Sequence, residues 1–418
     1  MKGWKKIRLG EVCRKIGSGA TPRGGGETYL ESGTFSLIRS QNVHNNRFTN
    51  DGLAFISQEQ ADELSNVEVL DGDVLLNITG DSVARCCQAP KNILPARVNQ
   101  HVAIIRPNAE ELDPTFLRYL LVSPQMQNQM LMLAGAGATR NALTKGMIEN
   151  FNVPKPDIIE QRAIASVLGT LDDKIELNRQ MNETLEALAQ TLFKDWFVDA
   201  AEKKLPKDWA IKSLAEITDI ITKGTTPTQI DVTNAPNSDV QVNFLRVNAI
   251  AEDGVILDDK LFKIPTSVHS GVLKRSILKA GDVAYTIAGT IGRMTVIRED
   301  LLPANCNQAI AIIRPKPEVP SGFILLSMKQ PSFQRELHSN IVHAVQANLS
   351  LGMLSKAKII FPPKNEFARL FQPINDLLKR IDANRAESRT LTELRDALLP
   401  KLLSGELRVP TKVKEAVA

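Results

Sequence analysis

The sequence has few cysteines and little net charge, and these shortages narrow the classes of protein it can belong to. Only four of the 418 residues are cysteine and no two form a CxxC pair, so we expect buried free thiols at Cys13, Cys86, Cys87 and Cys306. A disulfide framework and a zinc site are therefore disfavoured. The net charge of +4 permits a polyanionic partner but does not by itself indicate one.

Long hydrophobic runs are also absent. No run approaches the roughly 18 apolar residues that a membrane helix needs, and the first residues lack the apolar stretch of a signal peptide. We therefore expect a cytoplasmic protein that makes no membrane contact. The hydrophobic share of 43% is sufficient for buried cores, and the length predicts two or three domains.

Motifs for catalysis and nucleotide binding are missing as well. Pro22 stands where a GxGxxG motif starting at Gly17 requires its third glycine, and no Walker-type GxxxxGK sequence occurs. The Asn- or Asp-Pro-Pro-aromatic signature of an amino-methyltransferase is absent, and the five histidines form no spaced ligand set. We expect a non-catalytic protein with no metal and no cofactor of its own.

An internal repeat is the most informative feature that the chain does contain. At an offset of 205 residues, Trp4, Leu9, Glu11, Ile16, Gly19, Thr21 and Pro22 recur as Trp209, Leu214, Glu216, Ile221, Gly224, Thr226 and Pro227. With small changes of offset, Gly72-Asp73-Val74 matches Gly281-Asp282-Val283, and Asn99-Gln100 matches Asn307-Gln308. Matches in this order indicate two copies of one structural unit, with loops of different length.

Each copy has the same internal order of elements. Short apolar runs punctuated by Gly, Pro and Asn predict an α/β (α+β) domain with sheets and a few helices, one of them over 114–133. The apolar spacing then changes to three and four residues, which predicts a long amphipathic helix. The expected a and d positions are Ile164, Leu168, Leu171, Ile175, Asn178, Asn182, Leu185, Ala189, Leu192 and Trp196 in the first copy, and Phe367, Leu370, Ile374, Leu377, Ile381, Asn384, Ser388, Leu391, Arg395 and Leu398 in the second.

Residues that break or cap helices define the predicted boundaries. Pro156 excludes helix before Asp157, which can cap the first turn and form a capping box with Glu160. Pro206 ends the first helix, and Pro400 breaks or kinks the second. The predicted division is two globular domains at 1–156 and 201–363, two spacer helices at 157–200 and 364–404, and a C-terminal tail at 405–418.

We expect the two long helices to pack against each other in antiparallel orientation, because each must run from its own globular domain toward the other. The residues expected to pair them are Leu171, Ile175, Asn178, Leu185, Leu192, Leu377, Ile381, Asn384, Leu391 and Leu398. Asn178 and Asn384 occupy matching positions, where a polar partner would set the register, although both could also face water. About 36 helical residues span roughly 54 Å, which corresponds to at most about 16 base pairs of duplex DNA.

The helical segments resemble the spacer regions of type I restriction-modification specificity subunits. The resemblance lies in Glu160-Gln161-Arg162-Ala163-Ile164, in residues 171–178 and in residues 398–407. The globular copies resemble the target-recognition domains of that family in Gly19-Ala20-Thr21-Pro22 with Gly224-Thr225-Thr226-Pro227, and in Gly289-Thr290-Ile291-Gly292-Arg293. In the equivalent stretch of the first copy, Val83 replaces the second glycine.

The resemblance implies a sequence-specific subunit for double-stranded DNA, with each domain recognising one half of a bipartite, asymmetric target. It also implies two methyltransferase subunits and motor-nuclease subunits as partners, and those partners would bind S-adenosylmethionine, ATP and Mg²⁺. The main alternative is a structural adaptor that holds two protein-binding domains apart without DNA. The missing catalytic motifs disfavour a single-chain restriction enzyme.

Side chains that recognise base edges in the major groove concentrate in several loops. The candidates in the first copy are Gly19, Thr21, Arg39, Gln41, Asn42, Arg47, Thr79, Asn99, Gln100, Arg140 and Asn141; those in the second are Gly224, Thr226, Arg246, Asn248, Thr290, Arg293, Asn307, Gln308, Gln346 and Asn348. The two glycines would offer backbone amides to phosphate. For each single residue, ordinary turn or capping chemistry is an alternative.

Overall fold

Contacts divide the chain into two compact units, and each long helix contributes to both of them. The computed structural model describes residues 4–135, 142–199, 205–233, 235–236, 239–341 and 349–417. Unit 1 comprises Met1–Arg179 and Arg385–Ala418, and unit 2 comprises Gln180–Asn384. The predicted domain boundaries at 156, 200, 363 and 404 differ from this division and stay a prediction.

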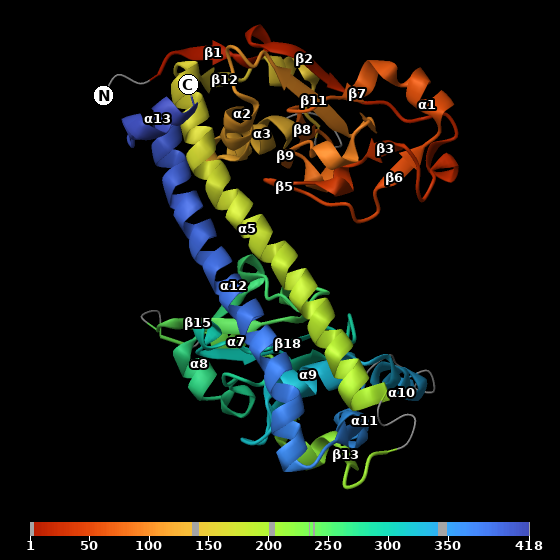
Figure 1. Cartoon of the computed structure of the whole chain (residues 1–418). Helices are drawn as coiled ribbons and strands as arrows, with labels where there is room; N and C mark the ends of the chain where they lie inside the picture. The colour runs from red at the N-terminus through yellow and green to blue at the C-terminus, as the bar shows by residue number, and fades with distance from the viewer. Residues whose placement is uncertain are drawn as a thin grey trace. The chain divides into compact units, whose positions relative to one another are not determined.

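Unit 1 is built on two four-stranded sheets (Figure 1). The first is antiparallel, in the order β2 (Cys13–Ser18), β11 (Val102–Pro107), β8 (Val74–Asn77) and β9 (Cys86–Gln88). The second has the order β6 (Ala54–Ile56), β3 (Phe35–Ile38), β10 (Ala96–Val98) and β7 (Glu68–Val69), and β3 and β10 are parallel.

Burial on both faces explains the continuous apolar runs of the central strands in unit 1. Val74 and Leu76 of β8 lie in the core that contains Phe116 and Leu168, whereas Leu75 lies in the core on the other side, which contains Ala61. Ile105 and Ile104 of β11 divide between the same two cores. A strand that is buried on both faces reads as a run of apolar residues without alternation.

Smaller elements complete unit 1. They are β1 (Lys6–Arg8) paired with β12 (Asn152–Pro154), the hairpin of β4 (Val43–His44) and β5 (Arg47–Phe48), and helices α1 (Gln58–Glu63), α2 (Pro114–Val122), α3 (Pro124–Gly135) and α4 (Lys145–Glu149). The single helix predicted over 114–133 is therefore wrong. The chain turns at Ser123, which has extended backbone as expected for a residue before proline.

Unit 2 repeats the architecture of unit 1. Its antiparallel sheet has the order β14 (Thr218–Lys223), β20 (Ile310–Pro315), β17 (Val283–Thr286) and β18 (Met294–Val296). A second sheet has the order β16 (Phe262–Pro265), β15 (Gln241–Leu245) and β19 (Ala304–Cys306), with β15 and β19 parallel. The remaining elements are β13 (Ala210–Ser213) paired with β21 (Lys358–Phe361), and helices α7 (Gln229–Thr233), α8 (Thr266–Ser270), α9 (Ser321–Lys329), α10 (Pro331–Ile341) and α11 (Leu351–Lys356). The matching strand orders confirm the repeat.

A buried ion pair occupies the same place in both units. The carboxylate of Asp73 accepts hydrogen bonds from Arg106 Nε and Nη2, both at 2.7 Å, and from the backbone N–H of Leu70. Asp282 makes the same two contacts with Arg314, also at 2.7 Å. The shared Gly-Asp-Val and Arg-Pro motifs thus tie the turn before β8 or β17 to the end of β11 or β20.

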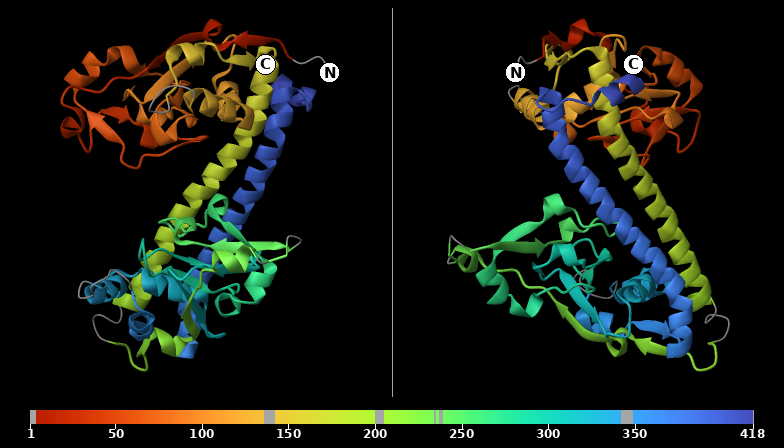
Figure 2. Two further views of the ribbon diagram at one scale, coloured as in Figure 1. Left: turned by 180° about the vertical axis from the view of Figure 1, so that it is seen from behind. Right: turned by 60° about the vertical axis from the view of Figure 1, so that its left-hand side comes forward.

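The predicted long helices are α5 (Ile158–Phe193), which continues into a π-helical segment at Lys194–Asp199, and α12 (Lys364–Ser404). Within each unit they lie side by side and antiparallel (Figures 1 and 2). α12 continues through Pro400 and ends before Gly405, whose φ of 74° is the left-handed conformation typical of a helix C-terminus. The fold class is therefore as predicted.

Polar contacts between α5 and α12 involve both predicted asparagines. In unit 1, Asn178 Nδ2 donates to Ser388 Oγ at 3.3 Å; in unit 2, Asn384 Nδ2 donates to Asn182 Oδ1 at 2.9 Å. Asn178 is 0% exposed and Asn384 is 1% exposed, so neither faces water. Of the other residues expected to pair the helices, Ile381 is buried and the following are half-buried: Leu171, Ile175, Leu185, Leu192, Leu377, Leu391 and Leu398.

The C-terminal residues form a helix that the sequence did not predict, α13 (Thr411–Val417). Val413 and Val417 pack against the core of unit 1 that contains Phe116 and Leu168. Asp157 Oδ1 accepts the N–H of Glu160 at 2.8 Å, which confirms the predicted cap of α5. The carboxylate of Glu160, predicted to complete a capping box, forms an ion pair with Lys414 of α13.

The buried Asp73–Arg106 pair predicts that substitutions of two neighbouring aspartates, Asp73 and Asp71, differ greatly in their effect on stability. Asp73→Asn leaves the Arg106 charge without its partner and should lower the free energy of unfolding by about 2–3 kcal/mol, since the Arg106 side chain keeps 24% exposure. Asp71→Asn is the matched control, because Asp71 pairs with the exposed Lys91 and should change little. Urea denaturation measures both, and equal losses would contradict this role for the buried pair.

Candidate nucleic-acid interface

The loops that carry the predicted DNA-binding residues of unit 1 meet at one end of its two sheets. Strands β2, β3, β8 and β10 end there, and β9 and β11 begin there. Backbone hydrogen bonds hold the loops together: Ala20 N to Val98 O at 3.2 Å, Asn99 N to Ile38 O at 3.0 Å, and Ile78 N to His101 O at 3.0 Å. We call residues 19–22, 39–47, 78–85 and 99–101 the unit-1 loop surface.

Unit 2 has the equivalent arrangement. Thr225 N donates to Cys306 O at 3.0 Å, Asn307 N to Leu245 O at 3.1 Å, and Ile287 N to Ala309 O at 2.8 Å. Residues 224–227, 246–248, 287–293 and 307–309 form the unit-2 loop surface. Candidates from four separate stretches of sequence are thus brought together in each unit.

Residues shared by the two copies hold these surfaces together. Thr21 Oγ1 donates to Gln100 Oε1, and Thr226 Oγ1 donates to Gln308 Oε1. A Cβ at Gly19 would lie 1.9 Å from Val98 O, and a Cβ at Gly224 would lie 2.2 Å from Cys306 O. Only glycine fits so close to another backbone, which explains why both copies have it.

Several side chains of unit 1 that are predicted to contact bases form hydrogen bonds within the protein. Asn42 is fully buried; its Oδ1 accepts the Arg39 N–H at 3.0 Å and its Nδ2 donates to Thr49 O at 3.1 Å. The side chains of Arg39 and Gln41 both donate to Gly52 O, at 2.5 and 3.1 Å. These contacts favour the alternative given above for Asn42, that it stabilises its own turn. The DNA-binding roles of the other residues stay predictions. The exposed candidates are Thr21, Gln41, Arg47 and Gln100, and Thr79 is half-buried.

In unit 2, two arginines are also held by the protein. The guanidinium of Arg246 lies 3.3 Å from the centroid of the Phe262 ring, and Arg293 Nη1 donates to Ile250 O at 2.8 Å. Asn307 is half-buried, and the exposed candidates are Thr226, Asn248, Thr290 and Gln308. Arg140, Asn141, Gln346 and Asn348 lie outside the described residues. Ala142 pairs with Thr79, and Leu349 N donates to Ile287 O, so both of these described residues contact the loop surfaces.

Two residues of the unit-1 loop surface were missed by sequence reasoning, Arg85 and His101. Arg85 is exposed and follows Ala84, whose φ is 73°; Arg293 follows Gly292, whose φ is 101°. The predicted replacement of the second glycine by Val83 is therefore wrong, because Ala84 adopts the left-handed turn and the first loop is one residue longer. Arg85 could have been found from its position directly after that turn, which matches the position of Arg293. Aligning the two copies without a gap hides this match.

The unit-1 loop surface carries positive charge beside His44. Burial lowers the pKa of His44, and the positive charges of Arg47 and Arg85 lower it further. A group of guanidinium charges next to a partly buried imidazole provides a favourable potential for phosphate.

The described residues show other features that bear on function. No three His, Cys, Asp or Glu side chains among them are grouped as metal ligands would be, and none of their helices is long and apolar enough to cross a membrane. All four cysteines are free thiols, three of them buried, and burial raises the pKa of Cys13 and of Cys87 to about 12.

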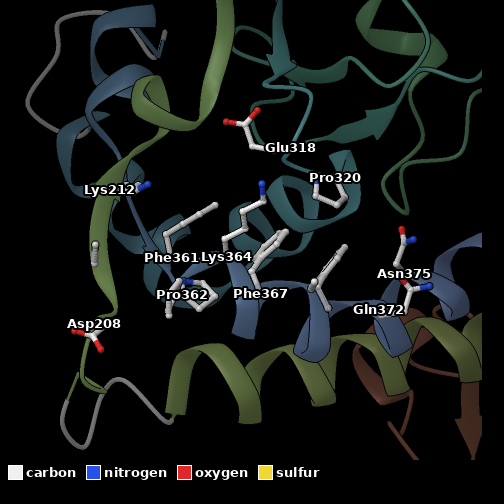
Figure 3. Close-up of a pocket in the computed structure, with 14 residues that line it drawn as sticks. Asp208, Lys212, Glu318, Pro320, Phe361, Pro362, Lys364, Phe367, Gln372 and Asn375 are labelled. Atoms are coloured by element: carbon white, nitrogen blue, oxygen red, sulfur yellow. The ribbon is translucent and has the colours of Figure 1, made fainter.

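A cavity of about 670 Å³ opens in unit 2 at the start of α12 (Figure 3). Its lining includes Phe361, Phe367, Phe371 and Pro320. Lys212 Nζ lies 4.4 Å from the centroid of the Phe361 ring. None of the predicted DNA-binding residues lines it, so it is separate from the loop surface.

Comparison with known proteins gives a consistent result. A family model described as the type I restriction modification DNA specificity domain matches residues 1–187 and 206–395, which correspond to the two copies. The chain is 26% identical over 482 residues to the type I restriction enzyme HindI specificity subunit of Haemophilus influenzae, covering 97% of this chain and 100% of that protein. It is 26% identical over 336 residues to the MjaIX specificity subunit of Methanocaldococcus jannaschii, covering 75% of this chain and 74% of that protein.

A solved structure resembles the whole chain. The crystal structure of a type I restriction-modification S subunit from M. genitalium matches with a TM-score of 0.58 at 16% identity, over 96% of each chain. At that identity the likeness shows the fold alone.

The glycine at the centre of the unit-1 loop surface can be tested against its neighbour. Gly19→Ala forces Val98 O to move and should destabilise the protein by about 2 kcal/mol and displace the loop that carries Thr21. In Gly17→Ala, the new methyl group meets nothing within 4 Å, so stability should be unchanged or slightly increased. Urea denaturation compares the two variants; if Gly19→Ala is as stable as the control, the close approach has no structural importance.

Proposed function

Because the chain belongs to the type I restriction-modification DNA specificity family, it is the non-catalytic DNA-specificity subunit of such a system, and we propose that each unit recognises one half of a bipartite DNA target. Membership implies assembly with methyltransferase and restriction subunits and with DNA. We also propose that two methyltransferase subunits bind this chain and supply S-adenosylmethionine. The restriction subunits would supply ATP and Mg²⁺, and the complex would act in the cytoplasm.

The observation that carries this proposal is the pair of loop surfaces built on one scaffold with different exposed side chains. Gly19 and Gly224 and the Thr–Gln hydrogen bonds are common to both. By contrast, unit 1 presents Gln41 where unit 2 presents Asn248, and the exposed Arg47 of unit 1 and Thr290 of unit 2 lie on different loops of their surfaces. Because Arg, Gln, Asn and Thr differ in the base edges that they bind, surfaces with the same frame and different side chains would recognise different half-sites.

The two long helices would set the number of unread base pairs between the half-sites. Each helix contributes to both units, and their contacts are specific: Arg395 Nη1 lies 2.8 Å from Asp172 Oδ1, and buried asparagines bond across the pair. Specific contacts hold one register of the helices. A fixed register would support a fixed spacer in the target.

Methylome sequencing tests the proposal directly. Cells that express this chain with its methyltransferase partner should carry methylated adenines in one interrupted motif, made of two different short half-sites separated by a constant number of unspecified bases. A continuous short motif would contradict two-part recognition. The empty expression strain gives the background.

A domain exchange serves as the control for independent recognition. Replacing residues 1–156 with those of a related specificity subunit should change one half of the motif and leave the other half and the spacing unchanged. A change in both halves would show that the two units do not act separately. If no motif is methylated and the assembled complex binds no duplex DNA, the structural adaptor becomes the better explanation.

A further inference from the structure

A chain of hydrogen bonds links three loops of the unit-1 loop surface through His101. Thr21 Oγ1 donates to Gln100 Oε1, Gln100 Nε2 lies 3.1 Å from His101 Nε2, and His101 Nδ1 lies 2.6 Å from Thr79 Oγ1. The backbone N–H of His101 also donates to Asn99 Oδ1 at 3.1 Å. Thr21 and Gln100 are exposed, and Thr79 and His101 are half-buried.

The direction of these bonds follows from the amide of Gln100. Its oxygen accepts from Thr21, so its nitrogen faces His101 and donates to Nε2. That ring nitrogen is therefore the acceptor, and the tautomer that completes the chain of bonds has its proton on Nδ1, from which it donates to Thr79 Oγ1. The hydroxyl proton of Thr79 and the second amide proton of Gln100 are then both available to an external acceptor.

Unit 2 has the same backbone and lacks this chain of bonds. Ile287 N donates to Ala309 O as Ile78 N donates to His101 O, and Gly289 has a φ of 75° where Gly80 has 74°. These matches place Ala309 at the position of His101 and Ala288 at the position of Thr79. The Thr226–Gln308 bond remains in unit 2. The fold of the loop therefore needs the Thr–Gln bond but neither the histidine nor the second threonine.

We propose that His101 is a specificity-determining positioning residue of unit 1, which holds Gln100 and Thr79 as two hydrogen-bond donors toward base acceptors in the first half-site. The acceptors that fit are purine N7, guanine O6 and thymine O4 in the major groove. Because the two donors contact different nitrogens of the imidazole ring, they would reach different acceptors. The inference rests on the proposed function, since it assumes that the unit-1 loop surface contacts DNA.

The test measures base discrimination at every position of the target. The complex of this chain with its methyltransferase subunit methylates a library of duplexes with single-base changes in the wild-type motif, and sequencing counts the products. His101→Ala should reduce discrimination about tenfold at one or two positions of one half-site. The other half-site and the spacing should stay unchanged.

Two further variants separate positioning from a general structural role. Thr79→Ala should relax discrimination at one of the positions that His101→Ala affects, whereas Thr79→Ser, which keeps the hydroxyl, should retain it. Ala309 in unit 2 shows that the loop accommodates alanine, so the thermal unfolding temperature of His101→Ala should match that of the wild type. If His101→Ala does not fold, the comparison of Thr79→Ala with Thr79→Ser tests the proposal instead.

The outcomes are distinguishable from a failure of the proposed function. A wild-type complex that methylates no bipartite motif contradicts the proposed function itself. A wild-type bipartite motif with an unchanged profile for His101→Ala and Thr79→Ala contradicts only the role of His101. A uniform loss across both half-sites also overturns it, because a positioning residue acts on its own half-site.

Discussion

The packing of α5 against α12 is the contact on which both units depend. Each unit takes the early part of one helix and the late part of the other, so neither is complete without residues from distant parts of the sequence. Leu399 and Leu402 of α12 belong to the core of unit 1, and Ala189 and Phe193 of α5 belong to that of unit 2. Because a long helix with an apolar stripe must bury it, pairing the helices also completes the two globular cores.

The repeat separates residues that build the scaffold from residues that distinguish its two versions. Scaffold residues occur twice in equivalent contacts, as in the Asp73–Arg106 and Asp282–Arg314 pairs. Residues that differ concentrate in loops at the sheet ends, where His101 faces Thr79 in unit 1 and two alanines stand in unit 2. This separation allows the specificity of one unit to change while its fold is kept.

Much of the fold could be predicted from the sequence, because apolar periodicity and internal repetition report directly on helices and on duplicated units. The paired helices and the repeated sheets are of this kind. Contacts between loops could not be predicted: Asn42 turned out to be buried in its own turn, and α13 carries too few apolar residues to distinguish it from a tail. His101 was missed because a single histidine has no spacing pattern, and its meaning depends on Thr79, which lies on a different loop.

A structure of the assembled complex on its target duplex tests the central claim most directly. The account predicts that bases of one half-site contact residues 39–47, 79–85 and 99–101 of unit 1, and that bases of the other contact residues 246–248, 288–293 and 307–309 of unit 2. Phosphates should lie near Arg47 and Arg85, whose charges already lower the pKa of His44. Bases bound at the opposite ends of the sheets, or along α5 and α12, would contradict it.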